Sequence, residues 1–468
     1  MSARHKCIKT GEVQGHVERF RAQVMPMWEG IWSWLGVTPD DFVGWVSEEI
    51  TQWRNTLYAP MLTLRMFMGQ SVEADKSCKN AVARESAAAG KVRCQNTGPY
   101  CRARGRLPLS LIRRIVLESG ERLRTRQPHE WRWHGMEVKL VDGTTVSMPD
   151  TQENQARFPQ SRTQKPGLGF PVARLVAVLS LSCGAVLEWA TGPCKGKSSG
   201  ETSMLQGLLS HFKAGDLVMA DRYYAGYFML AMLLKQGAQL VIRQHQLRKT
   251  DFRRGKRLGK GDHIVDWSKP PRPQWMDKST YATMPERLTL REIRVGNWIL
   301  VTSLLDARVF PRQELAALYP QRWQIELDLR SIKSVMKMDV LRCLTPDMVE
   351  KEIAIHLLAY NLIRTAMAQA AVEQGLQPRQ ISFKATLQLL RAHNNLLHST
   401  SELGSPADYV YAQLLCMIAA NVLPHRPGRV EPRVRKRRQS NYPLMTKSRN
   451  SMRKKLQKQK DRAMSQLE

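Results

Sequence analysis

The sequence predicts an α/β protein in which a sheet-forming region lies between two helical regions of the chain. Apolar residues recur at helical spacing through much of residues 1–131. Short apolar runs that are typical of buried strands begin near residue 133, and after the third run strands alternate with helices. Helical spacing returns at Tyr319 and extends to about residue 424.

The balance of charge is unusual for a globular protein. In 468 residues, 72 Lys and Arg face 41 Asp and Glu, which gives a formal net charge of +31. Such an excess favours a polyanionic partner, most often a nucleic acid. A membrane surface is the competing interpretation, but the most apolar stretch, 175–190, contains Glu188 and fits two buried strands. The scattered cysteines and the lack of a signal-peptide pattern favour a reducing cytoplasm.

Residues 1–131 are expected to form a helical, DNA-binding region. Helices are predicted over 16–35, 42–57 and 59–67. A turn at 96–99 then precedes a short helix with three basic side chains, Arg102, Arg104 and Arg106. Pro108 starts another helix over 109–123, so the pair resembles a helix-turn-helix whose second element is basic. The alternative is a basic surface helix without a role in DNA binding.

Residues 132–246 contain predicted strands, two of which end on an aspartate. The strand 137–142 ends on Asp142, and the strand 217–221 ends on Asp221. The other strands are predicted at 171–181, 186–190 and 239–243, with helices over 200–212 and 224–235. Functional groups of α/β proteins often lie at strand ends. Either aspartate alone could instead cap the turn or helix that follows.

Residues 247–305 are expected to form an inserted antiparallel sheet. A basic run with glycines is followed by short alternating stretches at 263–267, 288–295 and 297–303. Further helices are predicted at 346–371, 383–393 and 408–420. The tail from residue 425 is rich in Pro, Arg and Lys, so it should be flexible and bind nucleic acid non-specifically, although it could serve dimerisation instead.

The segment 319–333 places four polar side chains on one face of a predicted helix. Their offsets of 0, 3, 7 and 14 fall within a stripe about 60° wide at about 100° per residue. They belong to Tyr319, Arg322, Glu326 and Lys333. The carboxylate could bind a metal ion while the two cations hold a polyanion. The alternative is a surface helix in which Glu326 pairs with a neighbouring arginine.

Three carboxylates stand out together: Asp142, Asp221 and Glu326. Two neighbouring strand ends and one facing helix can bring three acids to a point. Three acids can hold two Mg²⁺ ions, which clamp the attacking and leaving oxygens of a phosphoryl transfer.

On these residues the chain resembles the DDE transposases of bacterial insertion sequences, of the IS-four type. The Tyr-x2-Arg-x3-Glu-x6-Lys signature matches from Tyr319 to Lys333. The stretches Leu140-Val-Asp-Gly-Thr-Thr and Met219-Ala-Asp-Arg-Tyr-Tyr resemble the blocks that hold the two aspartates. The resemblance runs from about residue 57 to the end. It implies a ribonuclease-H-like catalytic core that an all-β insertion interrupts before the Glu helix.

The expected divisions follow from this resemblance and from the changes of pattern. They are a helical N-terminal DNA-binding domain (1–131), a core in two parts (132–246 and 306–345), a β-strand insertion (247–305), a C-terminal helical region (346–424) and a basic flexible tail (425–468).

The resemblance also implies an activity and its residues. Family members cut double-stranded DNA at terminal inverted repeats and join the 3′ ends to target DNA, often through a hairpin intermediate, as homodimers in a synaptic complex. Asp142, Asp221 and Glu326 would bind Mg²⁺, for which Mn²⁺ can substitute. Arg322, Lys333 and Tyr319 would act at a phosphate of the transferred end. The expected location is the bacterial cytoplasm, at the nucleoid.

Two further residues are implied with less support from the pattern. Trp298 opens Trp-Ile-Leu-Val-Thr-Ser and matches in place the aromatic residue that stacks on a flipped base, while Arg243 resembles a phosphate-contacting arginine. Trp298 could instead be a core residue. Two other functions remain open: a nuclease of the same fold that cuts without joining, and a DNA-binding regulator with a decayed active site.

Overall fold

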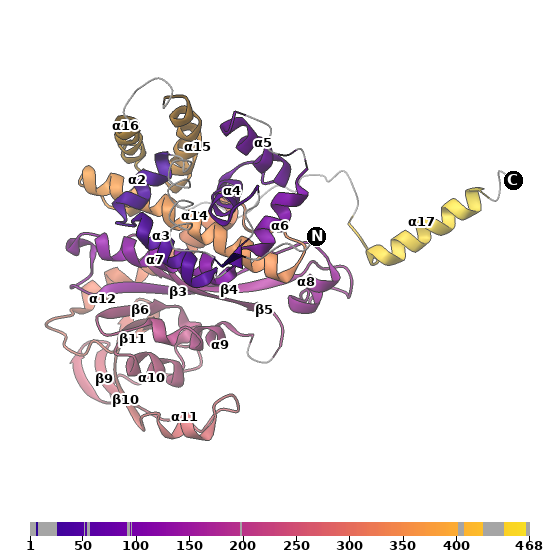
Figure 1. Ribbon diagram of the computed structural model, residues 1–468. Helices are drawn as coiled ribbons and strands as arrows, with labels where there is room; N and C mark the ends of the chain where they lie inside the picture. The colour runs from indigo at the N-terminus through magenta and orange to yellow at the C-terminus, as the bar shows by residue number, and fades with distance from the viewer. Residues whose placement is uncertain are drawn as a thin grey trace.

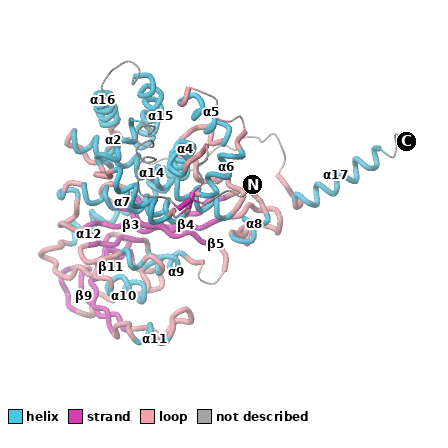
Figure 2. Tube along the Cα trace, viewed as in Figure 1, coloured by secondary structure: helices cyan, strands magenta, loops and turns pink. Residues whose placement is uncertain are grey.

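The computed structural model describes residues 6–7, 26–50, 52–53, 57–90, 94, 96–196, 199–400, 407–424 and 444–464. Within these ranges a large mixed sheet has helices on both of its faces, which confirms the predicted α/β class (Figures 1 and 2). No helix in the described ranges is long and apolar enough to cross a membrane. The predicted helix 16–35 and the tail lie partly outside the described residues.

In the described residues, nine strands form the main sheet, in the order β5-β4-β3-β6-β7-β11-β10-β9-β8. The first three along the chain are antiparallel to one another: β3 (Glu137–Ser147), β4 (Val172–Ser180) and β5 (Val186–Pro193). The next two run parallel to β3: β6 (Asp216–Ala220) and β7 (Gln239–Arg243). A separate small sheet pairs β1 (Lys6–Cys7) with β2 (Gln52–Trp53).

The strand β3 continues past Asp142, and the prediction that it ends there is wrong. β4 pairs with β3 as far as Ser147, and this partner keeps the strand extended through its two threonines and Val146. The parallel pairing of β3 with β6 does stop at Leu140 and Met219. Asp142 therefore lies just beyond the last parallel pair, close to the end of β6.

The strands of residues 247–305 pair antiparallel with one another, as the predicted inserted sheet requires, and they also extend the main sheet. They are β8 (Lys256–Gly259), β9 (Asp262–Ser268), β10 (Arg287–Val295) and β11 (Trp298–Thr302). β11 pairs antiparallel with β7, which would otherwise present an unpaired edge. A short helix, α11 (Lys278–Ala282), also interrupts the strands. Asp277 caps it by accepting the amide hydrogen of Thr280, so the segment is not all-β.

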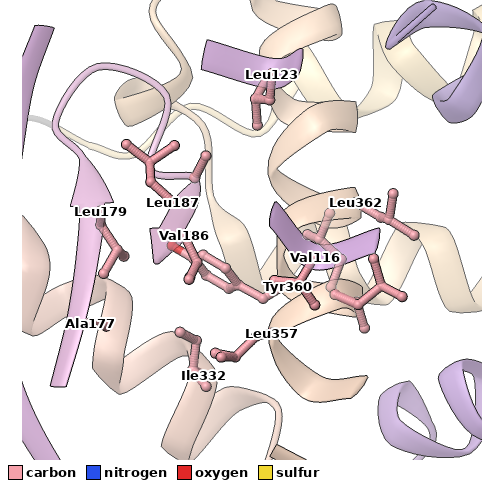
Figure 3. Close-up of a cluster of buried hydrophobic side chains, with 14 of the residues drawn as sticks. Val116, Leu123, Ala177, Leu179, Val186, Leu187, Ile332, Leu357, Tyr360 and Leu362 are labelled. Carbon is pink, nitrogen blue, oxygen red and sulfur yellow. The ribbon is translucent and has the colours of Figure 1, made fainter. Parts of the chain in front are cut away.

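One face of the sheet is covered by helices from both ends of the chain. The long helix α14 (Pro346–Glu373) packs against α7 (Leu109–Arg126) and β5. Figure 3 shows this core, in which Tyr360 and Leu357 of α14 lie among Val116 of α7 and Val186 of β5. Gly120 makes the contact possible, because a Cβ there would lie 2.2 Å from the carbonyl oxygen of Val186.

Further helices complete this layer. They are α2 (Pro26–Trp34), α3 (Pro39–Glu49), α4 (Pro60–Val72), α5 (Cys78–Ala88), α6 (Gly98–Arg106), α15 (Phe383–Thr400) and α16 (Ala407–Ala420). α3 ends at Glu49, eight residues before the end of the predicted helix 42–57. A short helix, α8 (Gln152–Arg157), follows β3.

The other face of the sheet is covered by α9 (Glu201–Gln206) and α10 (Tyr227–Lys235), with the 3₁₀ helices η2 (Leu209–His211) and η3 (Arg222–Tyr224) beside them. A second core forms there, in which Leu205 and Leu230 are buried with Val141 of β3. Because Leu140 belongs to the first core and Val141 to the second, alternate residues of β3 face opposite layers.

The described part of the tail, residues 444–464, is mostly helical, which the sequence analysis did not predict. α17 (Arg449–Met464) runs away from the rest of the protein (Figure 1). Its Lys, Arg, Gln and Leu residues are good helix formers, and Ser448 accepts the amide hydrogen of Ser451 at its start. The side chains from Arg449 to Arg462 are all exposed.

Candidate active site

The signature residues lie on one helical segment whose winding changes, although a single α-helix was predicted. α12 (Arg312–Leu318) leads into a 3₁₀ helix, η4 (Tyr319–Trp323), then α13 (Gln324–Arg330) and a π-helix, η5 (Ser331–Val335). Pro320 has no amide hydrogen to donate, which favours a change of winding at this point. The segment still presents the four signature side chains to the sheet.

Two hydrogen bonds dock this segment against β3 and the end of β6. The hydroxyl of Tyr319 donates to the carbonyl oxygen of Ala220 at 3.1 Å, directly before Asp221. Lys333 Nζ donates to Thr144 Oγ1 at 3.0 Å, two residues after Asp142. The predicted face is therefore turned toward both aspartates.

Arg322 links two of the three predicted acids. Its guanidinium donates to Glu326 Oε1 at 2.7 Å and to Asp142 Oδ2 at 3.5 Å, the second at the limit of a hydrogen bond. The three side chains are 16% (Arg322), 34% (Glu326) and 20% (Asp142) exposed. Glu326 does pair with an arginine, as in the alternative of an ordinary surface helix. This pair, however, lies at the end of the strands, beside Asp142.

Both aspartates also accept backbone hydrogen bonds. Asp142 accepts the amide hydrogen of Gly143 at 2.7 Å. Asp221 accepts that of Tyr223 at 2.8 Å and caps η3, so the capping role considered for it is real. Burial raises the pKa of Asp142 to about 6; the amide of Gly143 and Arg322 oppose this shift, while the charges of Asp221 and Glu201 add to it. A shifted carboxyl beside other charges is typical of functional sites.

A cavity of about 390 Å³ opens beside Asp221. Its lining combines arginine and aromatic side chains: Asp221, Arg222, Arg243, Trp298, Tyr319, Pro320, Arg322 and Trp323. Trp298 is half-buried and meets Tyr319 edge-on, with 5.8 Å between ring centroids. The guanidinium of Arg243 lies 5.6 Å from the centre of the Trp298 ring. Trp298 therefore packs partly against the core and partly lines this cavity.

Sequence reasoning missed some residues of this region. Trp323 is 45% exposed at the cavity and directly follows Arg322, so its place in the signature helix could have indicated it. Glu201 lies near Asp142, but no spacing rule connects the two residues. In the described ranges, no group of three or more His, Cys, Asp or Glu side chains is arranged to hold a metal ion. Arg322 instead lies between Asp142 and Glu326.

The three N-terminal arginines do not share one environment. Arg102 and Arg106 are exposed on α6. Arg104 is only 9% exposed, donates to Gln70 Oε1 at 3.4 Å and lies over the ring of Phe67. The predicted DNA contact by Arg104 is therefore contradicted, because its guanidinium faces the interior.

The fold and this site define a class of protein. A centre of carboxylates at the end of the strands, with arginines and aromatic rings around it, suits an enzyme that acts on phosphodiesters.

Residues 133–362 match the family described as "Transposase DDE domain". The chain is 31% identical over 362 residues to "Transposase InsG for insertion sequence element IS4" of Escherichia coli (strain K12), covering 75% of this chain and 78% of that protein. It is 26% identical over 106 residues to "Putative transposase InsZ" of the same organism, covering 22% of this chain and 34% of that protein.

The chain belongs to the DDE transposases of the IS4 type, as its signature predicted. It is an enzyme that cleaves DNA and transfers strands. Members of this family generally use divalent metal ions.

Proposed function

We propose that this transposase cuts double-stranded DNA at the terminal inverted repeats of its own insertion sequence and joins the 3′ ends to target DNA. The observation that carries this proposal is the Arg322 bridge, which brings the Glu326 carboxylate and the Asp142 carboxylate to one guanidinium beside the end of β6. The similarity to the Escherichia coli transposase for an insertion sequence element supports the same substrate.

We further propose a ribonuclease-H-like core. Three antiparallel strands followed by two strands parallel to the first, in the order β5-β4-β3-β6-β7, support it. In this proposal the core comprises residues 132–246 and 306–345, with 247–305 as the inserted strands. Residues 1–131 form the DNA-binding domain, 346–424 the C-terminal helical region and 425–468 the basic tail.

The residues present fit divalent metal ions. Carboxylates from β3, from the end of β6 and from α13 are the oxygen donors that Mg²⁺ and Mn²⁺ prefer, and a guanidinium already neutralises two of them. Asp142, Asp221 and Glu326 would hold the ions. When bound, such ions activate water and neutralise charge on the transferred phosphoryl group.

The other residues of the centre bind and orient the DNA. Arg322 and Lys333 can exchange their hydrogen bonds to Glu326 and Thr144 for phosphate oxygens. Tyr319 fixes the helical segment on the carbonyl oxygen of Ala220, which keeps the segment close to Asp221. Water attacks the first phosphodiester bond and frees a 3′-hydroxyl. In the hairpin route this hydroxyl attacks the opposite strand, a second water opens the hairpin and frees the 3′-hydroxyl again, and the hydroxyl then attacks the target. Each attack exchanges one phosphodiester bond of the DNA, so no covalent bond between protein and DNA is required.

The cavity beside Asp221 is the proposed site of a flipped nucleotide in a hairpin intermediate. Indole rings stack on bases and guanidinium groups contact phosphates, which suits Trp298 and Arg243. Arg102, Arg106 and α17 supply further DNA contacts, because their basic side chains are exposed. The enzyme would act as a homodimer in a synaptic complex, at the nucleoid in the cytoplasm.

The test uses DNA that carries the ends flanking the gene for this protein. Purified protein and its Glu326→Gln variant are incubated with this DNA and Mg²⁺, and the strands are separated on a denaturing gel. We expect cuts at the repeat ends and joined products from the native protein and neither from the variant. Cuts without joining would indicate a nuclease, and binding without cleavage in both would indicate a regulator.

A further inference from the structure

Glu201 lies beside the catalytic strand, on the face of the sheet opposite to the signature helix. It is the first residue of α9, and its side chain is 28% exposed. α9 packs in the core that contains Val141, whereas Ile325 of α13 packs in the core that contains Leu140. Glu201 and Glu326 therefore approach β3 from its two faces.

The carboxyl group of Glu201 is packed against the backbone next to Asp142. A Cβ at Gly143 would lie 2.4 Å from the carboxyl carbon of Glu201, closer than two such atoms can come. Glycine has no Cβ and lets the carboxyl group come this close, whereas a Cβ would force the end of the Glu201 side chain to move. Gly143, which directly follows Asp142, thus allows the carboxyl group of Glu201 to lie beside the Asp142 backbone.

Two side chains hold this carboxylate in place. The hydroxyl of Tyr224 donates to Glu201 Oε2 at 3.4 Å, and burial raises the pKa of Tyr224, so the hydroxyl stays protonated. Arg174 Nε of β4 lies 3.8 Å from Glu201 Oε1. Tyr224 belongs to η3, which Asp221 caps, so Glu201 connects the element after Asp221 with the backbone beside Asp142.

We propose that Glu201 is a positioning residue of the catalytic centre: it holds the Asp142–Gly143 backbone from the far face of the sheet and adds a fourth negative charge to the field that attracts the metal ions. This inference rests on the proposed function, in which Asp142 and Asp221 bind those ions. The competing role is a purely structural one, in which Glu201 only pairs with Arg174 and starts α9.

The test measures Mn²⁺ binding to the full-length protein without DNA by titration calorimetry. Glu201→Gln keeps the shape of the side chain and removes its charge, so the Kd for Mn²⁺ should rise about fivefold. Glu153→Gln is the matched control, because Glu153 is an exposed acid in the first turn of the short helix α8, and it should leave the Kd unchanged. Asp142→Asn reports on the proposed function itself.

The outcomes separate the two proposals. An unchanged Kd in Glu201→Gln together with weak binding in Asp142→Asn would overturn the role of Glu201 alone. Unchanged binding in both variants would overturn the metal site and this inference with it. Thermal melting of each variant shows that a changed Kd belongs to a folded protein.

A double-mutant cycle tests the packing of Glu201 on Gly143. Gly143→Ala adds a methyl group where the Glu201 carboxyl lies, so it should lower both Tm and Mn²⁺ affinity. In the Glu201→Ala background the same substitution has room and should lower Tm by clearly less. Equal losses of Tm in both backgrounds would contradict the proposed contact.

Discussion

Two acidic side chains of α13, two residues apart, lie in opposite environments. Glu326 faces the sheet edge, is 34% exposed and pairs with Arg322. Asp328 is fully buried between Arg364 of α14 and Arg379, and Arg379 donates to its two oxygens at 2.7 and 2.8 Å. Arg379 also donates to the carbonyl oxygens of Ser180 and Leu181 at the end of β4. One face of the helix is thus tied to the core of the protein.

The difference shows how a helix can serve stability and chemistry at once. A buried carboxylate with two arginines is strongly fixed, because removing one partner leaves buried charge uncompensated. A partly exposed pair contributes little to stability and can exchange partners, which a metal site or a phosphate requires. The Asp328 face therefore holds the segment, whereas the partly exposed pair on the Glu326 face can exchange partners.

The largest effect on stability is expected at Asp328. Asp328→Asn removes the charge that compensates Arg364 and Arg379, so the free energy of unfolding should fall by about 3–5 kcal/mol. Asp306→Asn is the control, because Asp306 is 50% exposed and its partner Arg308 is 96% exposed, so this pair should contribute less than about 1 kcal/mol. Urea denaturation measures both. An equal loss of unfolding free energy in both variants would contradict the stronger fixation of the buried Asp328 carboxylate.

Within the described residues, Lys76 is a buried cation without the close ion pairs that fix Asp328. It is 6% exposed, and its Nζ lies 2.7 Å from His356 Nε2. Burial lowers its pKa from 10.5 to about 8, against the opposing charge of Glu352. The folded protein therefore releases this proton before the unfolded chain does. The free energy of unfolding should rise between pH 8 and pH 10.5, by about 3 kcal/mol at most.

Lys76→Met provides the control for this pH dependence. The variant should lack the rise and should be more stable than the native protein at pH 7, where Lys76 is mostly protonated in both states. Denaturant titrations at several pH values measure this. A rise of the same size in the variant would assign the pH dependence to other groups.

A substitution of Arg322 probes the Glu326 face of the helix directly. Its guanidinium neutralises the Asp142 and Glu326 carboxylates, so it competes with a metal ion for them. Arg322→Gln should bind Mn²⁺ about threefold to tenfold more tightly without DNA. It should nevertheless cleave DNA about 100-fold more slowly, because the proposed phosphate contact is lost. Arg330→Gln, an exposed neighbour on α13, is the control, and weaker Mn²⁺ binding in Arg322→Gln would contradict the competition.

The smallest effect is expected at the cavity. Trp298→Ala should slow cleavage by about tenfold, because base stacking contributes about 1–3 kcal/mol. Its effect on Tm should be modest, since the side chain is only half-buried. Trp275→Ala is the control at a 54% exposed tryptophan outside the cavity. Equal cleavage rates in both variants would remove Trp298 from the site.

Local patterns predicted the elements but not their partners. The signature from Tyr319 to Lys333 and the strands that carry Asp142 and Asp221 follow from spacing within a few residues. The continuation of β3 depends on β4, and the joining of β11 to the main sheet depends on the edge of β7. The burial of Arg104 depends on Gln70, which lies on another helix.

The contacts of the candidate site could not be predicted from local patterns either. The placement of Glu201 depends on a contact with Gly143 across 58 positions of the sequence, as their numbers show. The 3₁₀ and π winding of 319–335 reflects where the segment is docked on both faces, by Tyr319 on one side and Asp328 on the other. No periodicity contains this information.

One paired measurement tests the two faces most directly: the DNA cleavage rate and the melting temperature of Glu326→Gln and Asp328→Asn, measured side by side with Mg²⁺. The structure predicts a crossed result, in which Glu326→Gln loses cleavage and keeps its Tm, whereas Asp328→Asn loses Tm and still cleaves at temperatures where it is folded. Cleavage at the native rate by a folded Glu326→Gln protein would contradict the assignment of this carboxylate to the catalytic centre.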